Sequence, residues 1–412
     1  MNRGLVRVFS ATAFLAFLAA AQPTALPQSA TASSEKVPKA LEGAGYVFVS
    51  GQGPQQPGSI APGKFLDQVR QTLDNIKVVL QSTGLTTDHI VYVQVYLEDV
   101  QQVRELDEVF ASYFPKDPPA RAVLGVARVP ASPIQINAIA VRNLQGKQAV
   151  SVPGMKTSKA FSAGMLTHDQ LFVSTMQGRD PATGGVPQDP ALQVNLALDG
   201  LKSVVEAAGL TMAHMVFVNP YMTSDISYRA MNEQYAKRFE FGNTPGRATI
   251  EISSLPDGAH IAYTGIAVRD LSWRQAVRPK NMLPSPTASP CVFAGDILYC
   301  SAKSGFIPGP NGGVYFSSTA DQTRQTMRNL LDNLEEAGMT FEQVVSTTIY
   351  LDDLSDTDSF EKVYTPYFPK DLPTQTIVQQ LPPGNRKADE EGHYPTLEQV
   401  SLIAIRGRRE SK

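Results

Sequence analysis

The stretch FLDQVRQTLDNIKVVLQSTGLT, from Phe65 to Thr86, is the key to how the chain is organised. Its apolar residues recur at spacings of three and four, which is the pattern of an amphipathic helix with one buried face. They are Phe65, Val69, Leu73, Ile76 and Leu80. Gly84 follows them, and a glycine at this point commonly ends a helix. The stretch therefore predicts a helix that packs on a core and ends near Gly84.

The same pattern occurs twice more. The second copy ends in Gly209-Leu210-Thr211 and the third in Gly338-Met339-Thr340. The strand-like run that follows each helix keeps the same spacing, with tyrosines at Tyr96, Tyr221 and Tyr350. Because two independent features recur in one register, the sequence predicts three copies of one structural unit.

Each copy has the same order of expected elements. Two runs rich in β-branched and aromatic residues precede the helix, most clearly Tyr46 to Ser50, Leu171 to Ser174 and Ile297 to Ser301. A strand, a second helix and two closing strands follow it, with the second helix ending near Phe114, Phe239 and Phe368. The unit is therefore β-β-α-β-α-β-β, an α+β sheet with its helices on one face.

The expected units span residues 40–144, 158–271 and 287–408. The linkers between them, at about Leu144 to Lys159 and Leu271 to Thr287, contain proline or glycine and few periodic apolar positions. The third unit carries an extra polar segment from Pro383 to Pro395, which we interpret as a solvated loop.

Composition narrows the classes of function. The 36 Lys and Arg residues nearly balance the 39 Asp and Glu residues, for a net charge of −3, which does not favour nucleic acid as a partner. Two cysteines are too few for a four-thiolate zinc site, and the five histidines form no H-E-x-x-H motif. We therefore expect neither a metal ion nor a cofactor.

The first 21 residues read as a secretory signal peptide. Arg3 and Arg7 precede an apolar run from Val8 to Ala21 that ends in small residues. The alternative, a membrane anchor, needs about 20 apolar residues, and this run is shorter. Residues 22–39, rich in Pro, Ser and Ala, are expected to be a flexible lead-in. The mature protein is thus expected to be secreted or periplasmic, with no membrane association after removal of the signal.

The units resemble the reactive intermediate deaminase family, also called Rid or YjgF, which has a chorismate-mutase-like fold. The resemblance rests on Val49-Ser50-Gly51-Gln52, on Pro119-Ala120-Arg121 and on Met231-Asn232 with Tyr235, and it extends from about Lys36 to Arg406. Members are usually one third of this length and form homotrimers with ligand pockets between subunits. The resemblance implies that three fused units form an internal pseudo-trimer in a monomeric chain. Three independent domains on flexible linkers are the alternative.

The resemblance also implies a set of site residues. In the family an arginine holds the carboxylate of a small imino or enamino acid, and Arg121 and Arg247 match it, whereas the third unit has Gln375. Ser50, Ser174 and Ser301 match a serine whose hydroxyl can donate to a ligand oxygen. Asn232 matches the family's asparagine, which is replaced by Asp107 and Glu361 elsewhere. Phe161 takes the place of a tyrosine on the first strand.

The family's hydrolytic members carry an acidic residue on the last strand, and it is replaced here by Gln135, Ala262 and Gln399. Glutamine can orient a water molecule but cannot take its proton. The resemblance to the family implies a hydrolase that converts enamines or imines to keto acid and ammonia. A non-catalytic protein that binds small carboxylates in degenerate pockets is the alternative, and a structural role in a larger assembly also stays open.

The two cysteines flank an expected two-residue turn. Cys291-Val292-Phe293-Ala294 and Ile297-Leu298-Tyr299-Cys300 surround Gly295-Asp296, a dipeptide suited to a tight hairpin. That register places Cys291 opposite Cys300, within small adjustment of disulfide geometry. The sequence therefore predicts a disulfide, with two buried free thiols as the alternative.

Overall fold

The computed structural model describes residues 37–55, 63–309 and 313–407 of the 412-residue chain. The expected signal peptide (1–21) lies outside the described residues, as does the expected lead-in (22–39) except for its last three residues. Within the described ranges, no helix combines the length and the apolar character needed to span a bilayer.

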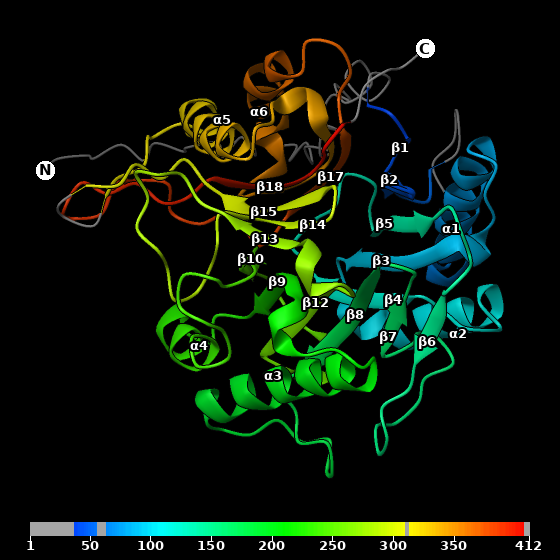
Figure 1. The fold of residues 1–412 in the computed structure, drawn as a ribbon. Helices are drawn as coiled ribbons and strands as arrows, with labels where there is room; N and C mark the ends of the chain where they lie inside the picture. Colours follow the sequence, from blue (N-terminus) through cyan, green and yellow to red (C-terminus); the bar gives the residue numbers. More distant parts are fainter. Residues whose placement is uncertain (1–36, 56–62, 310–312, 408–412) are drawn as a thin grey trace, which may run out of the picture. The chain divides into compact units, whose positions relative to one another are not determined.

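Three repeats follow one another along the chain (Figure 1). Repeat 1 comprises β1 (Ala40–Gly43), β2 (Tyr46–Gln52), α1 (Phe65–Ser82), β3 (Ile90–Leu97), α2 (Val103–Tyr113), β4 (Ala120–Gly125) and β5 (Ile134–Val141). Repeat 2 comprises β7 (Gly164–Leu166), β8 (Gln170–Gln177), α3 (Pro190–Ala207), β9 (Met215–Met222), α4 (Tyr228–Tyr235), β10 (Gly246–Arg247), β11 (Ile250–Glu251) and β12 (Ile261–Val268). Repeat 3 comprises β14 (Cys291–Ala294), β15 (Ile297–Lys303), α5 (Thr319–Glu336), β16 (Val344–Leu351), α6 (Thr357–Tyr364), β17 (Thr374–Gln379) and β18 (Glu398–Ile405).

Each repeat forms one mixed sheet with the same topology. The strand order in repeat 1 is β1-β2-β5-β3-β4, and the equivalent strands of the other repeats keep it. β3 and β4 run parallel, whereas the other neighbours in this sheet are antiparallel. This arrangement confirms the predicted β-β-α-β-α-β-β unit.

The first helix of repeat 1 forms as its sequence pattern predicts. Val69, Leu73, Ile76 and Leu80 are all buried against the sheet. Gly84 has a φ of 75°, a left-handed conformation that glycine adopts without steric cost and that ends the helix.

Both expected linkers contribute short strands, which the sequence analysis missed. β6 (Gln148–Val150) pairs with β7, and β13 (Arg274–Val277) pairs with β14, so each linker extends the sheet of the repeat that follows it. Strands of three or four residues at a sheet edge lack the alternation over several residues that identifies longer strands.

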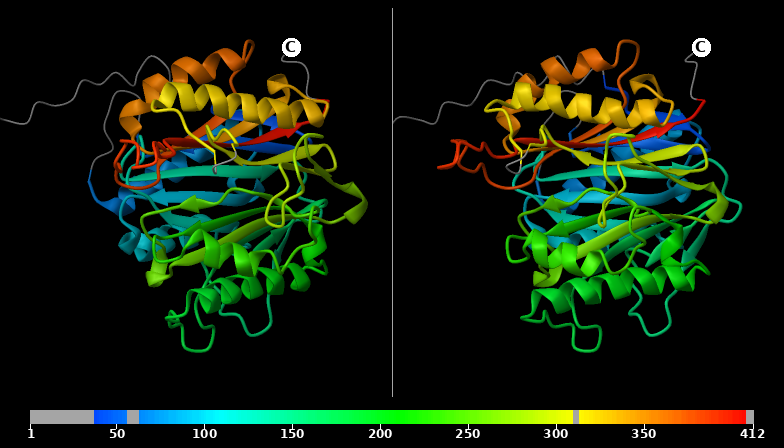
Figure 2. Two further views of the ribbon diagram at one scale, coloured as in Figure 1. Left: turned by 90° about the vertical axis from the view of Figure 1, so that its left-hand side faces the viewer. Right: turned by 60° about the vertical axis from the view of Figure 1, so that its left-hand side comes forward.

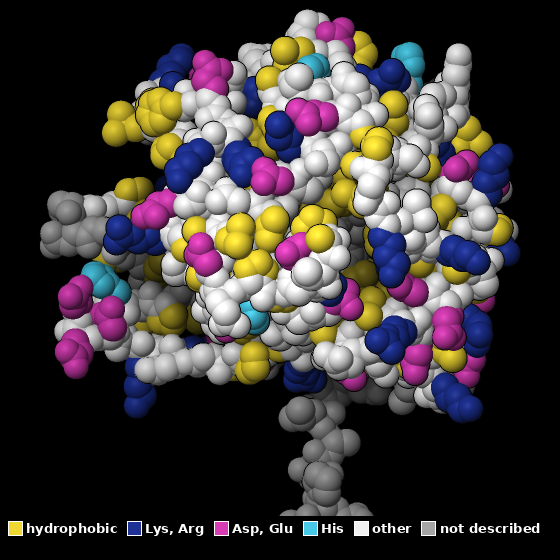
Figure 3. All heavy atoms as spheres, turned by 90° about the horizontal axis from the view of Figure 1, so that it is seen from below, with side chains coloured by type: hydrophobic (Ala, Val, Ile, Leu, Met, Phe, Trp, Pro, Cys, Tyr) yellow, Lys and Arg dark blue, Asp and Glu magenta, His cyan; other side chains and the backbone are white. Residues whose placement is uncertain are grey.

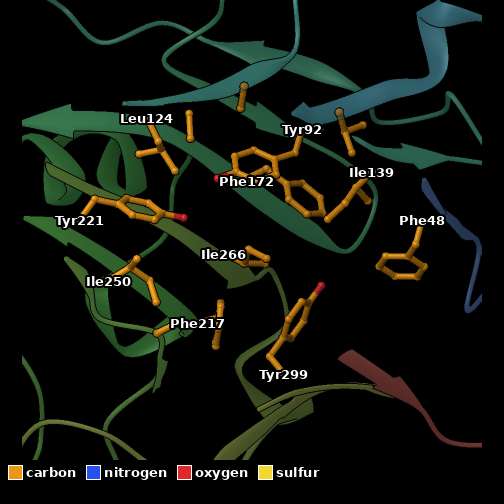
Figure 4. Packing of buried hydrophobic residues seen from close by; sticks show 14 of the residues in the cluster. Phe48, Tyr92, Leu124, Ile139, Phe172, Phe217, Tyr221, Ile250, Ile266 and Tyr299 are labelled. Atoms are coloured by element: carbon orange, nitrogen blue, oxygen red, sulfur yellow. The ribbon is translucent and has the colours of Figure 1, made fainter. Parts of the chain in front are cut away.

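The inner faces of the three sheets share one hydrophobic core, while the helices lie outside them (Figure 2). Aromatic side chains from different repeats meet there, including Tyr92, Phe172, Phe217, Tyr221 and Tyr299 (Figure 4). Each repeat has a second, separate core between its sheet and its own helices. The shared core confirms the internal pseudo-trimer, and the alternative of three independent domains is wrong.

The hairpin at the start of repeat 3 has the predicted register. β14 and β15 pair Ala294 with Ile297 and Cys291 with Cys300. The Cα atoms of the two cysteines lie 4.0 Å apart, and their sulfur atoms form a disulfide. The bond joins neighbouring strands on the helix-facing side of the sheet, in the same core as α5.

The extra segment of repeat 3 is an irregular, largely exposed loop, as predicted, but ion pairs attach it to the domain. Within it, Arg386 binds Asp352 at 2.8 Å and Asp356 at 2.6 Å. Pro395 at its end accepts a hydrogen bond from Gln322 on α5. The loop is therefore attached both to the segment between β16 and α6 and to α5.

Candidate functional site

The edges of neighbouring sheets meet at three places, which we call sites A, B and C. Site A lies between β4 of repeat 1 and β8 of repeat 2, site B between β10 and β15, and site C between β17 and β2. At each site a serine joins the two repeats. Its hydroxyl accepts a hydrogen bond from a backbone N–H of the other repeat at that site, namely Arg121 with Ser174, Arg247 with Ser301 and Gln375 with Ser50.

Each of the three serine hydroxyls also donates a hydrogen bond to a backbone carbonyl oxygen. Ser50 donates to the carbonyl of Pro38, Ser174 to that of Ser162 and Ser301 to that of Ser289, at 2.5–2.6 Å. A serine has one O–H donor, so none remains for a ligand oxygen. In this structure Ser50 and Ser174 connect the repeats, and their donation to a ligand oxygen, expected from the sequence, stays a prediction.

Site A contains an arginine whose surroundings are closed. The Arg121 guanidinium lies between the rings of Phe110 and Phe161, with its carbon 4.8 Å from each ring centroid. One of its nitrogens forms an ion pair with Asp107, although Nη1 has no hydrogen-bond partner among the described residues. Burial lowers the pKa of Arg121, and Asp107 opposes that shift. Because Asp107 neutralises the cation and Phe161 covers its second face, a carboxylate ligand would have to displace an existing ion pair.

Site B presents the second arginine differently. Arg247 donates from Nη1 to the amide oxygen of Asn232 at 2.7 Å and lies 5.1 Å from the ring centroid of Tyr235. Within residues 37–55, 63–309 and 313–407, no carboxylate forms an ion pair with it. Burial lowers the pKa of Arg247, and only phenol groups oppose that shift. An arginine stays protonated at neutral pH, so site B holds a partly buried positive charge without a counter-ion from the described chain.

Arg121 and Arg247 differ in their surroundings partly because of a residue that the next repeat supplies. β7 and β14 are equivalent strands, because Gly164 pairs with Val173 as Cys291 pairs with Cys300. Counting back three residues, the position of Phe161 is taken by Ala288 in repeat 3. The second face of the Arg247 guanidinium therefore has no aromatic cover from that position.

Site C lacks the cation altogether. Gln375 occupies the arginine position, and its neighbour Tyr364 exchanges a hydrogen bond with Thr347 at 2.8 Å. Gln135, one of the three residues that replace the family's acidic residue on the last strand, belongs here. It lies against Gly51, where a Cβ atom would be only 2.7 Å from its side chain. Gln135 therefore shares a site with Gln375 rather than with either arginine.

Comparison with known proteins agrees with this architecture. A family model described as Endoribonuclease L-PSP matches residues 28–142, 153–269 and 282–386. A RutC family protein of Pyrococcus horikoshii is 37% identical over 107 residues, which cover 25% of this chain and 85% of that protein. The chain belongs to this family, the Rid family. The match occurs once in each repeat.

Solved structures also match parts of the chain. Yeast Mmf1 is 32% identical and covers 26% of this chain and 86% of its own, with a TM-score of 0.25. Escherichia coli TdcF, solved with bound serine, is 24% identical and covers 30% of this chain and all of its own, with a TM-score of 0.27. Each covers a length of this chain comparable to one repeat.

Strand register supports the alignment of the last strand of each Rid repeat. Gln135 pairs with Tyr96, Ala262 with Tyr221 and Gln399 with Tyr350, so the three residues are equivalent. By the same equivalence Gln399 belongs to site B, in the repeat that supplies Ser301. No carboxylate occupies this position in any of the three Rid repeats.

Sequence reasoning missed Thr249 in the Rid site. It lies two residues beyond Arg247 on the same face of the edge strand, and its hydroxyl is buried without a hydrogen-bond partner among the described residues. The alternation along 247–252 could have revealed it. Ala248, Ile250 and Ile252 face the shared core, so the residues between them must face α4.

Proposed function

We propose that site B binds a small carboxylate and hydrolyses imines or enamines derived from amino acids to 2-oxo acids and ammonia. The observation that carries the proposal is the uncompensated charge of Arg247. A guanidinium donates two parallel, charge-assisted hydrogen bonds to a carboxylate, and burial strengthens them because water does not compete. Membership of the Rid family supports the reaction class.

The reaction needs few protein groups. Water adds to the carbon of the C=N bond, one of its protons passes to the nitrogen, and a carbinolamine forms. Its C–N bond then breaks while the hydroxyl loses its proton, which yields the 2-oxo acid and ammonia. In this proposal Arg247 anchors the substrate carboxylate and Gln399 orients the water by hydrogen bonds. Because glutamine is not a base, solvent carries the protons.

The test replaces each arginine by glutamine, the residue that repeat 3 has at the equivalent position, Gln375. A freshly generated 2-imino acid is mixed with the protein, and semicarbazone trapping gives the rate. Arg247→Gln should lower kcat/KM about 10²-fold, because a partly buried, charge-assisted pair is lost. Arg121→Gln, the matched control, should retain activity within about twofold once folding is verified by circular dichroism. Equal losses in both variants, or none in Arg247→Gln, would contradict the proposal.

A second function is binding without turnover. The observation that favours it is the absence of a carboxylate at the last-strand position of all three repeats, since a missing general base can cost roughly 10²–10⁴-fold in rate. The turnover assay, together with a titration that measures binding of a 2-oxo acid, separates the two functions. Saturable, Arg247-dependent binding of a 2-oxo acid without any turnover of the imine would favour the receptor.

A small-molecule ligand also agrees with the surface charge. On the face seen from below, acidic and basic side chains lie interspersed rather than gathered into a basic stripe (Figure 3). Nucleic acid binding relies on clustered Lys and Arg, so this face does not favour an RNA substrate.

We propose in addition that the protein acts after export. The pattern of residues 1–21 supports this, and so does a disulfide between Cys291 and Cys300, because such bonds persist in oxidising compartments. Protein isolated without reductant should begin near Gln22 by mass spectrometry and show no free thiol when unfolded, and two after reduction. An intact Met1 or two free thiols before reduction would contradict the proposal.

A further inference from the structure

Site B continues along its edge strand as a row of polar side chains. The row comprises Arg247 on β10, Thr249 between the two short strands, and Glu251 on β11. These residues alternate with the core residues Ala248, Ile250 and Ile252. Side chains two and four residues apart on a strand lie on the same face. The row therefore places a cation, a hydroxyl and a carboxylate in line on the face that α4 covers.

The row is specific to this site. The equivalent positions are Arg121, Val123 and Gly125 in repeat 1, and Gln375, Ile377 and Gln379 in repeat 3. In neither case does a cation share the row with a carboxylate. Only site B, among the three, has opposite charges at the two ends of its strand edge.

The two charges of the row do not neutralise each other. About 13 Å of strand separates the α-carbons of Arg247 and Glu251, and the two side chains form no ion pair. Between them the hydroxyl of Thr249, which is 9% exposed as a residue, has no hydrogen-bond partner among the described residues. A buried hydroxyl without a partner is costly, so its position points to a missing polar group.

Tyr228 on α4 connects the two ends. It lies on the same helix face as Asn232 and Tyr235, which contact Arg247. Burial raises the pKa of Tyr228, Glu251 raises it further and Arg247 lowers it, so both charges act on one phenol. Its ring is half-exposed, 44% as a residue, and can cover the middle of an extended ligand.

Space for the far end of a ligand adjoins Glu251. This residue forms part of the wall of a cavity of about 420 Å³, together with Asp225. Asp225 already accepts a hydrogen bond from Thr223 at 2.7 Å and lies 3.0 Å from the ring of His260, so Glu251 is the carboxylate that favours a cationic group there. The arginine at the other end favours an anionic group.

We propose that the ligand of site B is two-ended, with a carboxylate on Arg247 and an ammonium or guanidinium group at Glu251. This inference rests on the proposed function and narrows its substrate class to the imino or oxo acids of dibasic amino acids. The aliphatic chain of such a molecule spans Thr249 and Tyr228, and its carbonyl or imino group lies close to Arg247.

The experiment uses three stable probes of equal length: hexanoate, 6-aminohexanoate and adipate. Isothermal titration calorimetry on the full chain should show 6-aminohexanoate binding about fivefold more tightly than hexanoate, and adipate more weakly, because a partly exposed ion pair contributes up to about 1 kcal/mol. Glu251→Gln should bring the three affinities within about twofold of one another and leave that of hexanoate unchanged. Glu233→Gln, which removes an exposed carboxylate of α4 that pairs with Arg229, is the matched control and should retain the order.

The outcomes separate this inference from the function on which it rests. If hexanoate and 6-aminohexanoate bind equally well and both depend on Arg247, the two-ended ligand is ruled out and the carboxylate site stands. A preference that survives Glu251→Gln also rules it out. If no probe shows saturable binding, or if binding is indifferent to Arg247→Gln, the carboxylate site itself fails.

Discussion

Replacing Glu398 by glutamine should stabilise the protein by about 5 kcal/mol at pH 9 and by only about 1 kcal/mol at pH 5. Glu398 is fully buried beneath α5, at a position where the other repeats have Ile134 and Ile261. Thr326 donates a hydrogen bond to one carboxyl oxygen. Burial raises the pKa of Glu398 from 4.5 to about 8, and the hydrogen bonds it accepts oppose that rise only in part.

The direction of the pH dependence follows from this raised pKa. The folded protein holds the proton more tightly than the unfolded chain, so the carboxyl favours folding most at a pH below 4.5. This stability is lost as the pH rises toward 8 and stays lost above it. Glutamine keeps the acceptor for Thr326 without the charge.

Urea unfolding at pH 5, 7 and 9 measures the effect. The difference between wild type and Glu398→Gln should grow with pH, and Glu398→Ile should show the same trend. Glu335→Gln, on the exposed side of α5, should leave the pH profile unchanged. A stability difference that is constant over this range would show that Glu398 titrates normally.

Phe172→Ala should lower the free energy of unfolding by about 3–5 kcal/mol and destabilise repeat 1 as well as repeat 2. The side chain is fully buried in the shared core, although it belongs to β8 of repeat 2. Its ring centroid lies 5.9 Å from that of Tyr46 and 6.1 Å from that of Tyr92, both in repeat 1. Phe172→Ala therefore leaves a cavity between repeats rather than within one.

Hydrogen exchange shows whether the loss is shared. In Phe172→Ala, amide protection should fall in β2 and β3 as well as in β8, because their packing depends on the same ring. Val78→Ala on the exposed side of α1 is the control and should change neither stability nor exchange. Loss of protection confined to β8 would mean that the repeats are stabilised independently.

Features encoded in short stretches could be predicted from the sequence. The helix from Phe65 follows from its spacing of apolar residues, and the pairing of Cys291 with Cys300 follows from a two-residue turn. In both cases the residues that decide the structure are within a few positions of one another. The number of repeats and their order of elements were predictable because the same local pattern occurs three times.

The character of each site could not be predicted, because residues far apart in the sequence determine it. Arg121 and Arg247 look alike in the sequence, and both follow a Pro-x dipeptide. What separates them is Asp107 on a nearby helix and Phe161 from the next repeat, which contact Arg121. The protons of the serines are committed to backbone carbonyls twelve residues away, and no spacing rule indicates that choice.

The joining of three repeats in one chain also changes how the sites can evolve. In a homotrimer a single codon specifies the same residue in every pocket, so a substitution that closes one pocket closes all. Here each pocket takes its residues from two different repeats, and every one of those residues has its own codon. Asp107 could arise and close site A while Asn232 preserved site B. In a chain of fused repeats, a substitution at one site therefore leaves the residues of the other two sites unchanged.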